Sequence, residues 1–341
     1  MPRPAPATLA PAVLAGDRRA AARALTFVEN GLEGADALVD ALYPHTGRAW
    51  RLGITGPPGA GKSTLTDRLV AAFRQQGKTV AVVAVDPSSP FTGGALLGDR
   101  VRMTAGIGDA GVFVRSLAAR GALGGLSLTT EAACDVLDAA GFDVILVETV
   151  GVGQGEIDVA QAADTVLVVL VPASGDAVQA MKAGLMEVAD LFAVNKADQP
   201  EAALLVRALG SMLRLRTRGF RSLSSDGALA EGHPDVPPIV KTSATKNEGI
   251  GDLVAALDAH RAALQEAGAW AARRDERLKR RVRELVEVEL ERRFWTPERR
   301  AALGDAVATL DGADRAPHRL ADAVLAGTLT DPERAGSGAG R

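Results

Sequence analysis

Eight consecutive residues, from Gly56 to Ser63, fit the pattern G-x-x-x-x-G-K-[ST], and Thr64 follows them. Glycines at these places let backbone N–H groups converge on a phosphate, where the start of the following helix adds positive potential. The lysine, Lys62, would reach the β- and γ-phosphates, and the hydroxyl of Ser63 would bind Mg²⁺. The pattern therefore predicts a nucleotide-phosphate site. Its residues are Gly56, Gly59, Ala60, Gly61, Lys62, Ser63 and Thr64.

A second pattern, N-K-x-D at residues 195–198, bears on the choice of base. Asp198 can accept two hydrogen bonds, from guanine N1–H and from the 2-amino group, and adenine lacks both donors. The stem of Lys196 can lie along the base plane, while Asn195 is expected to tie this loop to its neighbours. The chain later carries T-S-A at 242–244, where the backbone N–H groups of Ser243 and Ala244 would donate to guanine O6. The two patterns favour guanine.

Acidic residues at or beyond the ends of two further predicted strands, 144–149 and 79–86, are candidates for holding Mg²⁺, and a glycine-rich loop that we expect to be mobile follows the first of these strands. Glu148 opens E-T-V-G at 148–151, where it can reach the Mg²⁺ shell through a water molecule, and the N–H of Gly151 can sense the γ-phosphate. Gln154 could orient the attacking water, although its spacing from Gly151 is unusual. Asp86 ends another strand and could order metal-bound water or the attacking water. Asp99 is a second metal candidate, but it would serve equally well as a solvated turn acid.

The elements that must position these residues alternate along the chain. Short β-branched runs without polar alternation are typical of strands covered on both faces. Their alternation with helical patterns over roughly 200 residues favours an α/β fold with a doubly wound, mainly parallel sheet. The predicted strands are 51–55, 79–86, 112–116, 144–149, 165–172, 191–195 and 239–242. The predicted helices are 8–45 with a break near Asn30-Gly31, 63–76, 128–140, 177–189, 201–215 and 252–300, and 217–238 is expected to be irregular.

Composition excludes several other classes. With 39 basic and 42 acidic side chains among 341 residues, the net charge of −3 gives no global reason to expect a nucleic-acid partner. One cysteine, Cys134, and four scattered histidines leave no disulfide framework or zinc finger. No apolar run approaches the ~18–20 residues of a membrane helix, and the proline-broken start makes a poor signal peptide. We therefore expect a cytoplasmic protein that does not enter a membrane. Only seven of the 39 basic residues are lysines, which indicates that arginine serves wherever any positive charge suffices. We therefore expect a lysine in this chain to be chemically required more often than in a chain of average composition.

Five segments together resemble the MeaB/ArgK family of P-loop GTPases. They are the phosphate loop, DPSSPFTGGALLGDRVRM at 86–103, VRSLAARGALGGLS at 114–127, ETVGVGQGE at 148–156 and NKAD at 195–198. The resemblance spans about residues 10–295. It implies a P-loop GTPase domain at 49–255, between an N-terminal helical extension at 1–48 and a C-terminal helical, dimerising extension at 256–341. It also implies that GTP hydrolysis gates cofactor loading into an adenosylcobalamin (B12)-dependent acyl-CoA mutase, above all methylmalonyl-CoA mutase, and protects that enzyme.

The resemblance also carries residue roles over by position. Asp86, Asp99 and Glu148 match the acids around Mg²⁺, and Arg102 matches an arginine of the first switch that helps at the γ-phosphate. A further switch loop at 171–182, which responds to the mutase, has as its polar members Asp176, Gln179 and Lys182. Gly155 departs from the family, where serine commonly follows the glutamine. A dimerisation arm within 272–300 would use the apolar stripe Leu278, Val282, Leu285, Val286 and Leu290.

The expected reaction is in-line attack of water on the γ-phosphate, giving GDP and phosphate by positioning and charge stabilisation. The residues assigned to this step are Lys62, Asp86, Arg102, Glu148 and Gln154. Three alternatives stay open. A metal-delivery GTPase would need a Cys/His cluster, a P-loop kinase or ATPase linked to amino-acid transport would need an acceptor, and a scaffold would bind GTP without turnover.

Overall fold

The computed structural model describes residues 8–86, 108–118, 125–149, 155–172, 184–221 and 236–330. The chain divides into two compact units, Met1–Lys279 and Arg280–Arg341. The first unit contains the sheet and the predicted nucleotide-site motifs.

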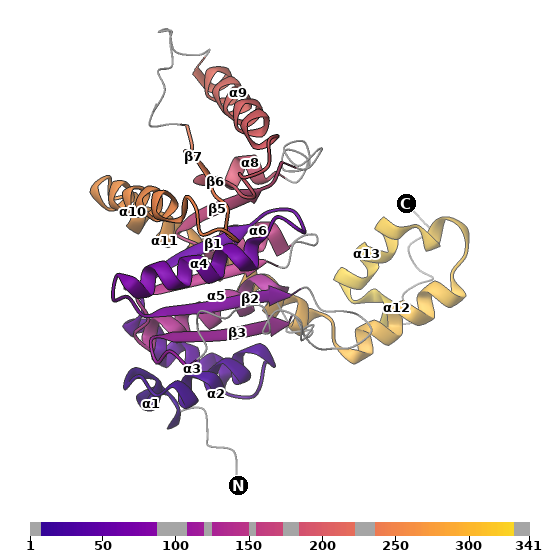
Figure 1. The fold of residues 1–341 in the computed structure, drawn as a ribbon. Helices are drawn as coiled ribbons and strands as arrows, with labels where there is room; N and C mark the ends of the chain where they lie inside the picture. Colours follow the sequence, from indigo (N-terminus) through magenta and orange to yellow (C-terminus); the bar gives the residue numbers. More distant parts are fainter. Residues whose placement is uncertain are drawn as a thin grey trace. The chain divides into compact units, whose positions relative to one another are not determined.

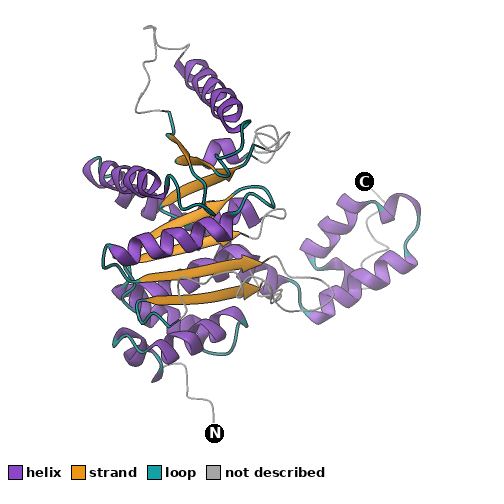
Figure 2. Cartoon of the chain, in the orientation of Figure 1, coloured by secondary structure: helices purple, strands orange, loops and turns teal. Residues whose placement is uncertain are grey.

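Seven parallel strands form one sheet in the order β3-β2-β4-β1-β5-β6-β7 (Figures 1 and 2). After the central strand β1, the chain continues to β2 on one side of it, whereas after β4 it crosses to β5 on the opposite side. The direction of the connections therefore changes between the adjacent strands β1 and β4. In open α/β sheets, ligands bind at the carboxyl ends of the strands at such a switch point. The strands are β1 (Trp50–Thr55), β2 (Val80–Asp86), β3 (Val112–Ala118), β4 (Val144–Thr149), β5 (Thr165–Leu170), β6 (Leu191–Val194) and β7 (Ile239–Lys241).

Helices cover both faces of the sheet, which explains the unbroken apolar character of the strands. Alternate strand residues pack against α4 (Lys62–Gln75) and α10 (Ile250–Glu266) on one face. The opposite face of the sheet packs against α5 (Gly125–Ala139) and α6 (Gly155–Ala162). The remaining helices of that face are α1 (Ala10–Leu14), α2 (Arg18–Glu29) and α3 (Ala35–Leu42), which pack around α5, and α8 (Leu185–Val188) and α9 (Ala202–Arg221) near β6.

Buried charges hold the amino end of the sheet. Arg51 of β1 is 5% exposed, and its Nη2 lies 2.7 Å from Asp135 Oδ1. Asp164, which precedes β5, accepts a 3.0 Å hydrogen bond from the Arg51 amide, and its own amide donates to the Arg51 carbonyl. Arg274 and Arg277 of α11 (Ala269–Phe294) form ion pairs with the same aspartate at 2.9 and 3.0 Å. The strand that carries the phosphate loop is therefore fixed at its start.

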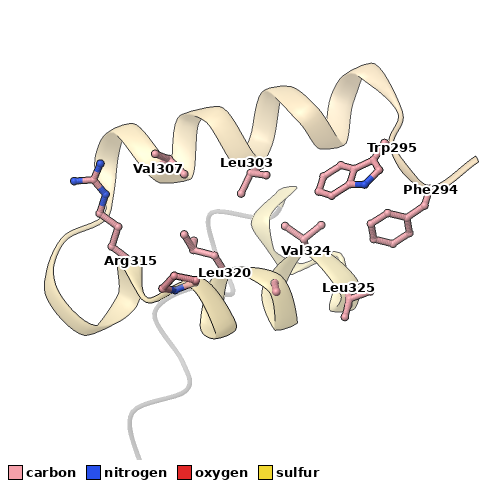
Figure 3. Close-up of a pocket in the computed structure, with 10 residues that line it drawn as sticks. Phe294, Trp295, Leu303, Val307, Arg315, Leu320, Val324 and Leu325 are labelled. Carbon is pink, nitrogen blue, oxygen red and sulfur yellow. The ribbon is translucent and has the colours of Figure 1, made fainter. Parts of the chain in front are cut away.

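The second compact unit contains the end of α11, α12 (Pro297–Thr309) and α13 (Pro317–Ala326). Thr296 caps α12 by accepting a hydrogen bond from the Arg299 amide at 3.3 Å. A pocket of about 700 Å³ opens between these helices, with Phe294 and Trp295 at one end and Arg315 at the other (Figure 3). Its remaining lining is apolar: Leu303, Val307, Pro317, Leu320, Ala321, Val324 and Leu325.

The strand predictions are confirmed, each within two residues at either end. The predicted irregular segment is wrong at its start, because α9 continues to Arg221. The predicted helix 252–300 is interrupted twice, near Gly268 and Thr296, since α10 ends at Glu266 and α11 at Phe294. Of the predicted helix 177–189, residues 177–183 lie outside the described part and only Leu185–Val188 are helical beyond it.

The expected domain boundaries at residues 48 and 255 stay a prediction. None of the helices that the structure describes combines the length and apolar character needed to cross a membrane.

Candidate functional site

The phosphate loop joins β1 to α4 in a backbone conformation that needs glycine. Gly56 has a φ of +139°, and a Cβ there would collide with the carbonyl of Val169 in β5. Gly61 has a φ of +82°, and a Cβ there would lie 2.6 Å from Asn195 Nδ2. These two glycines therefore let the loop approach β5 and the N-K-x-D loop closely, as well as supplying left-handed backbone.

Lys62 is the first residue of α4, and it is 5% exposed. Its ammonium donates hydrogen bonds to the carbonyls of Gly56 at 2.7 Å and Pro57 at 3.1 Å. The side chain thus lies across the loop and beside the helix N-terminus, where its positive charge and the helix dipole can both meet an anion. Thr64 is exposed on the same first turn.

Ser63 and Glu148 come together where β1 and β4 end. The Ser63 hydroxyl donates to Glu148 Oε1 at 2.6 Å, and Glu148, which is 4% exposed, lies beside Ile54 in the sheet register. A hydroxyl and a carboxylate are the hard oxygen ligands that Mg²⁺ accepts, so these two residues fit a magnesium site. Asp86 is the last residue of the neighbouring strand β2, and the position of its side chain is not described.

Asn195 connects three loops, as the N-K-x-D pattern predicted. Its Nδ2 donates to the carbonyl of Ala60 in the phosphate loop at 2.9 Å. Its Oδ1 accepts hydrogen bonds from the Ala244 amide at 3.1 Å and from the Thr242 hydroxyl at 3.3 Å. The neighbouring Lys196 has left-handed backbone, with a φ of 54°, and its ammonium donates to the Gly59 carbonyl at 2.9 Å.

Asp198 has two side-chain partners that the sequence patterns did not predict. The Ser243 hydroxyl donates to Oδ1 at 3.0 Å, and the Lys246 ammonium lies 3.3 Å from Oδ2. The hydrogen bond from Ser243, with those from the Asp198 amide and from Lys246, lowers the pKa of the Asp198 carboxyl. The carboxylate is therefore ionised at neutral pH and is a strong acceptor for paired N–H donors.

The amides of Ser243 and Ala244 already have acceptors within the protein. The Ser243 amide donates to the Glu248 carbonyl at 3.0 Å, and the Ala244 amide donates to Asn195 Oδ1. Donation to guanine O6, as the sequence predicted, would require each amide to exchange or share its hydrogen bond. This role of the two amides stays a prediction, and the Ser243 hydroxyl donates to Asp198 Oδ1.

The other predicted residues lie outside the described part of the chain. They are Asp99, Arg102, Gly151, Gln154, Asp176, Gln179 and Lys182. Among the residues that the structure describes, no group of three or more His, Cys, Asp or Glu side chains could hold a metal ion. His260 lies 3.2 Å from the Thr165 hydroxyl and 3.4 Å from Asp190, at the amino end of the sheet.

The chain is similar to known proteins over most of its length. Residues 21–299 match the family described as methylmalonyl-CoA mutase-associated GTPase MeaB. The chain belongs to this family. It is accordingly a GTPase with a P-loop fold, as its motifs predicted.

Individual relatives span different shares of the chain. GTPase ArgK of Escherichia coli is 37% identical over 260 residues, which cover 74% of this chain and 75% of the relative. A mouse protein named methylmalonic aciduria type A homolog, mitochondrial, is 36% identical over 66% of this chain and 52% of its own length. A crystal structure described as an LAO/AO transport system kinase superposes with a TM-score of 0.69 at 27% identity and covers 97% of this chain and 99% of its own.

Proposed function

We propose that this MeaB-family GTPase gates cofactor loading into an adenosylcobalamin-dependent acyl-CoA mutase and protects that enzyme from inactivation. Methylmalonyl-CoA mutase is the first candidate partner. The single observation that carries the proposal is the family match across residues 21–299. The convergence of the phosphate loop, the Ser63–Glu148 pair and the N-K-x-D loop supports the nucleotide part.

Each loop would take one portion of GTP. The amides of Gly56, Gly59, Ala60 and Gly61 and the Lys62 ammonium would hold the phosphates, which would replace or join the carbonyls that Lys62 now contacts. Asp198 would accept hydrogen bonds from guanine N1–H and the 2-amino group, while the Lys196 stem would lie along the base. Asn195 would keep the base and phosphate loops at a fixed separation, because it bonds to both.

Ser63 and Glu148 would hold Mg²⁺, Glu148 through a water molecule, with Asp86 and Asp99 as further candidates. Bound Mg²⁺ would neutralise charge on the phosphates. Water would attack the γ-phosphate in line, and Lys62 would stabilise the charge that develops on the oxygens. Arg102 and Gln154 remain candidates for contacting the γ-phosphate and orienting the water. This chemistry needs no covalent intermediate, and its products are GDP and phosphate.

Binding and turnover with purified mutases test the proposal. Methylmalonyl-, isobutyryl- and ethylmalonyl-CoA mutases would each be mixed with the protein in the GDP, GTP-analogue and nucleotide-free states. We expect one of them to bind in a nucleotide-dependent manner and to raise the single-turnover rate of GTP hydrolysis. Ser63→Ala serves as the matched variant, because it should abolish the Mg²⁺-dependent rate without altering the mutase surface. Absence of binding in every state would refute the mutase role.

We also propose that the protein is a homodimer formed through its C-terminal helices. Val282, Leu285, Val286 and Leu290 of α11 are 47–61% exposed. Within the described part of the second unit, the buried apolar side chains are Ala306, Leu320 and Val324, and each is still 6–8% exposed. A unit of this size has a weak core by itself, so partner helices would supply the missing burial. Sedimentation should give a dimer that Leu285→Arg converts to a monomer. Leu204→Arg, at an exposed leucine of α9, should leave the dimer intact.

A phosphoryl-transfer function is a second candidate, because the solved structure with a TM-score of 0.69 is described as a transport system kinase. Incubation with γ-labelled GTP and basic amino-acid-binding transport proteins distinguishes the two. Label recovered only as free phosphate would support hydrolysis, and label on an acceptor would support the kinase.

A further inference from the structure

Lys246 lies at the guanine end of the site, although no sequence pattern gave it a role. Its Nζ is 3.3 Å from Asp198 Oδ2, and the Ser243 hydroxyl is 3.0 Å from Oδ1 of the same carboxylate. Each carboxylate oxygen therefore has one donor from the segment that follows β7. The two donors approach different oxygens, so together they oppose rotation of the carboxylate about its Cβ–Cγ bond.

A closed turn determines the position of Lys246. Ser243 and Glu248 exchange backbone hydrogen bonds of 3.0 and 3.1 Å, and the Lys246 amide donates to the Ser243 carbonyl at 3.1 Å. Asn247 takes left-handed backbone, with a φ of 58°. At Gly249 (φ +72°) a Cβ would collide with the Lys241 carbonyl, so the turn needs glycine at its exit. The turn is anchored at both ends, and the lysine extends from it toward Asp198.

The number of acceptor positions on the carboxylate limits how a base can bind. An ionised carboxylate offers about four lone-pair positions, two on each oxygen. Ser243 and Lys246 use one position on each oxygen, and the Asp198 amide uses a third, which a base that pairs with both oxygens would share or replace. Guanine presents two adjacent donors, N1–H and the 2-amino group, which need one acceptor position on each oxygen.

We propose that Lys246 is a positioning residue that determines base specificity: with Ser243, it fixes the Asp198 carboxylate so that both of its oxygens face the two donors of guanine. The inference rests on the proposed role of Asp198 in base recognition. Lys246 stays on the carboxylate when the nucleotide binds, and it is not displaced by the base. The other charged groups of these two loops are Lys196, whose ammonium bonds to Gly59, and Glu248, whose backbone closes the turn.

The proposal predicts that replacing Lys246 reduces the difference in affinity between GDP and inosine diphosphate (IDP). Inosine diphosphate lacks the 2-amino donor, so it uses one oxygen of Asp198, whereas GDP uses both. A carboxylate that can rotate holds one donor nearly as well as before but loses the paired geometry. Substitution of Lys246 should therefore weaken GDP binding more than IDP binding. It should also raise the pKa of Asp198, so the acid pH at which GDP affinity falls should move upward.

Calorimetric titration of GDP, IDP and ADP tests this in the full-length protein and in three variants. Lys246→Met should weaken GDP binding about 1.5- to 5-fold, the range of an exposed ion pair, and should lower the GDP-to-IDP affinity ratio. Lys246→Arg should restore both values. Lys279→Met is the matched control, because Lys279 is 64% exposed and pairs with Glu276 on α11.

Three results would distinguish a wrong role for Lys246 from a wrong assignment of base recognition to Asp198. Unchanged or tighter GDP binding in Lys246→Met would overturn the role of Lys246. An equal loss for GDP, IDP and ADP would also overturn it, because that pattern indicates a general change of the fold. A wild-type protein that binds ADP as well as GDP would instead refute base recognition by Asp198 itself.

Discussion

Replacing Arg51 by methionine measures how strongly buried charge holds the amino end of the sheet. Methionine keeps the unbranched apolar stem of the side chain but removes the guanidinium cation. The Arg51 guanidinium contacts Asp135 at 2.7 Å and approaches Asp138 to 3.8 Å, and all three side chains are at most 6% exposed. Although burial opposes it, the charges of Asp135 and Asp164 raise the pKa of Arg51, so the arginine is charged throughout the accessible pH range.

The expected decrease in the free energy of unfolding depends on which other partners the carboxylates near Arg51 keep. Asp138 accepts three backbone amides, from residues 47–49, and Asp164 keeps Arg274 and Arg277. Asp135, which is 1% exposed, loses its 2.7 Å ion pair with Arg51. Breaking a buried ion pair from one side costs about 3–5 kcal/mol. This is a large part of the ~5–15 kcal/mol by which a typical domain is stable.

Guanidinium unfolding at two pH values checks this reasoning. Without the arginine, the buried Asp135 carboxylate has lost its closest cation, so burial favours its neutral form. The variant's native state then gains a proton as pH falls, and the loss of stability should be smaller at pH 5 than at pH 8. Arg48→Met, at an exposed arginine three residues earlier, should change the free energy of unfolding by about 0.5 kcal/mol or less. A loss below about 1 kcal/mol at pH 8, or an equal loss at both pH values, would refute the argument.

Three further predictions concern the nucleotide site and the core. Asp198→Asn should shift the preference from GTP to XTP, because xanthine presents an acceptor where guanine has its 2-amino donor, and unchanged GTP affinity in a competition assay would contradict the base assignment. Gly61→Ala should weaken GDP binding by about tenfold or more, whereas Gly77→Ala, with a similar φ of +78° and open space around its Cβ, should leave the affinity unchanged. Burial raises the pKa of the Cys134 thiol to about 12, so iodoacetamide at pH 8 should label this thiol only after the protein unfolds. Intact-mass measurement follows the labelling, and rapid labelling of the native protein would contradict the burial of Cys134.

The strands could be predicted from local sequence because short β-branched runs without polar alternation are typical of strands that helices cover on both faces. They failed where a helix boundary depends on single residues. The segment after Leu215 looked irregular because of its Gly, Ser and Pro content, yet α9 continues to Arg221. The break before α12 had a signal that was not used: Thr296 followed by Pro297 is typical of a helix start.

The phosphate-loop and base-loop residues were predictable because backbone-driven anion binding and guanine recognition each need fixed spacing. Their mutual contacts were not predictable. The bonds from Lys246 and Ser243 to Asp198 depend on how the turn 243–248 closes, which follows from the bridge between Ser243 and Glu248. Likewise, nothing in the spacing of Arg51 and Asp164 indicated that they meet, since 113 residues separate them.

The two ends of β1 show how this fold can combine a rigid frame with loops that respond to a ligand. At the amino end, Arg51 and Asp164 bond to each other through backbone and side chain, and α11 adds two arginines to the same aspartate. At the carboxyl end, Gly56 and Gly61 carry no side chain, so the loop can present its backbone and the Lys62 ammonium to an anion. Because packed cores resist displacement, a nucleotide bound at the open end would move the loops rather than the strand. Asp164 also anchors the start of α11, so a change at this aspartate should alter the phosphate-loop strand and the start of α11 together.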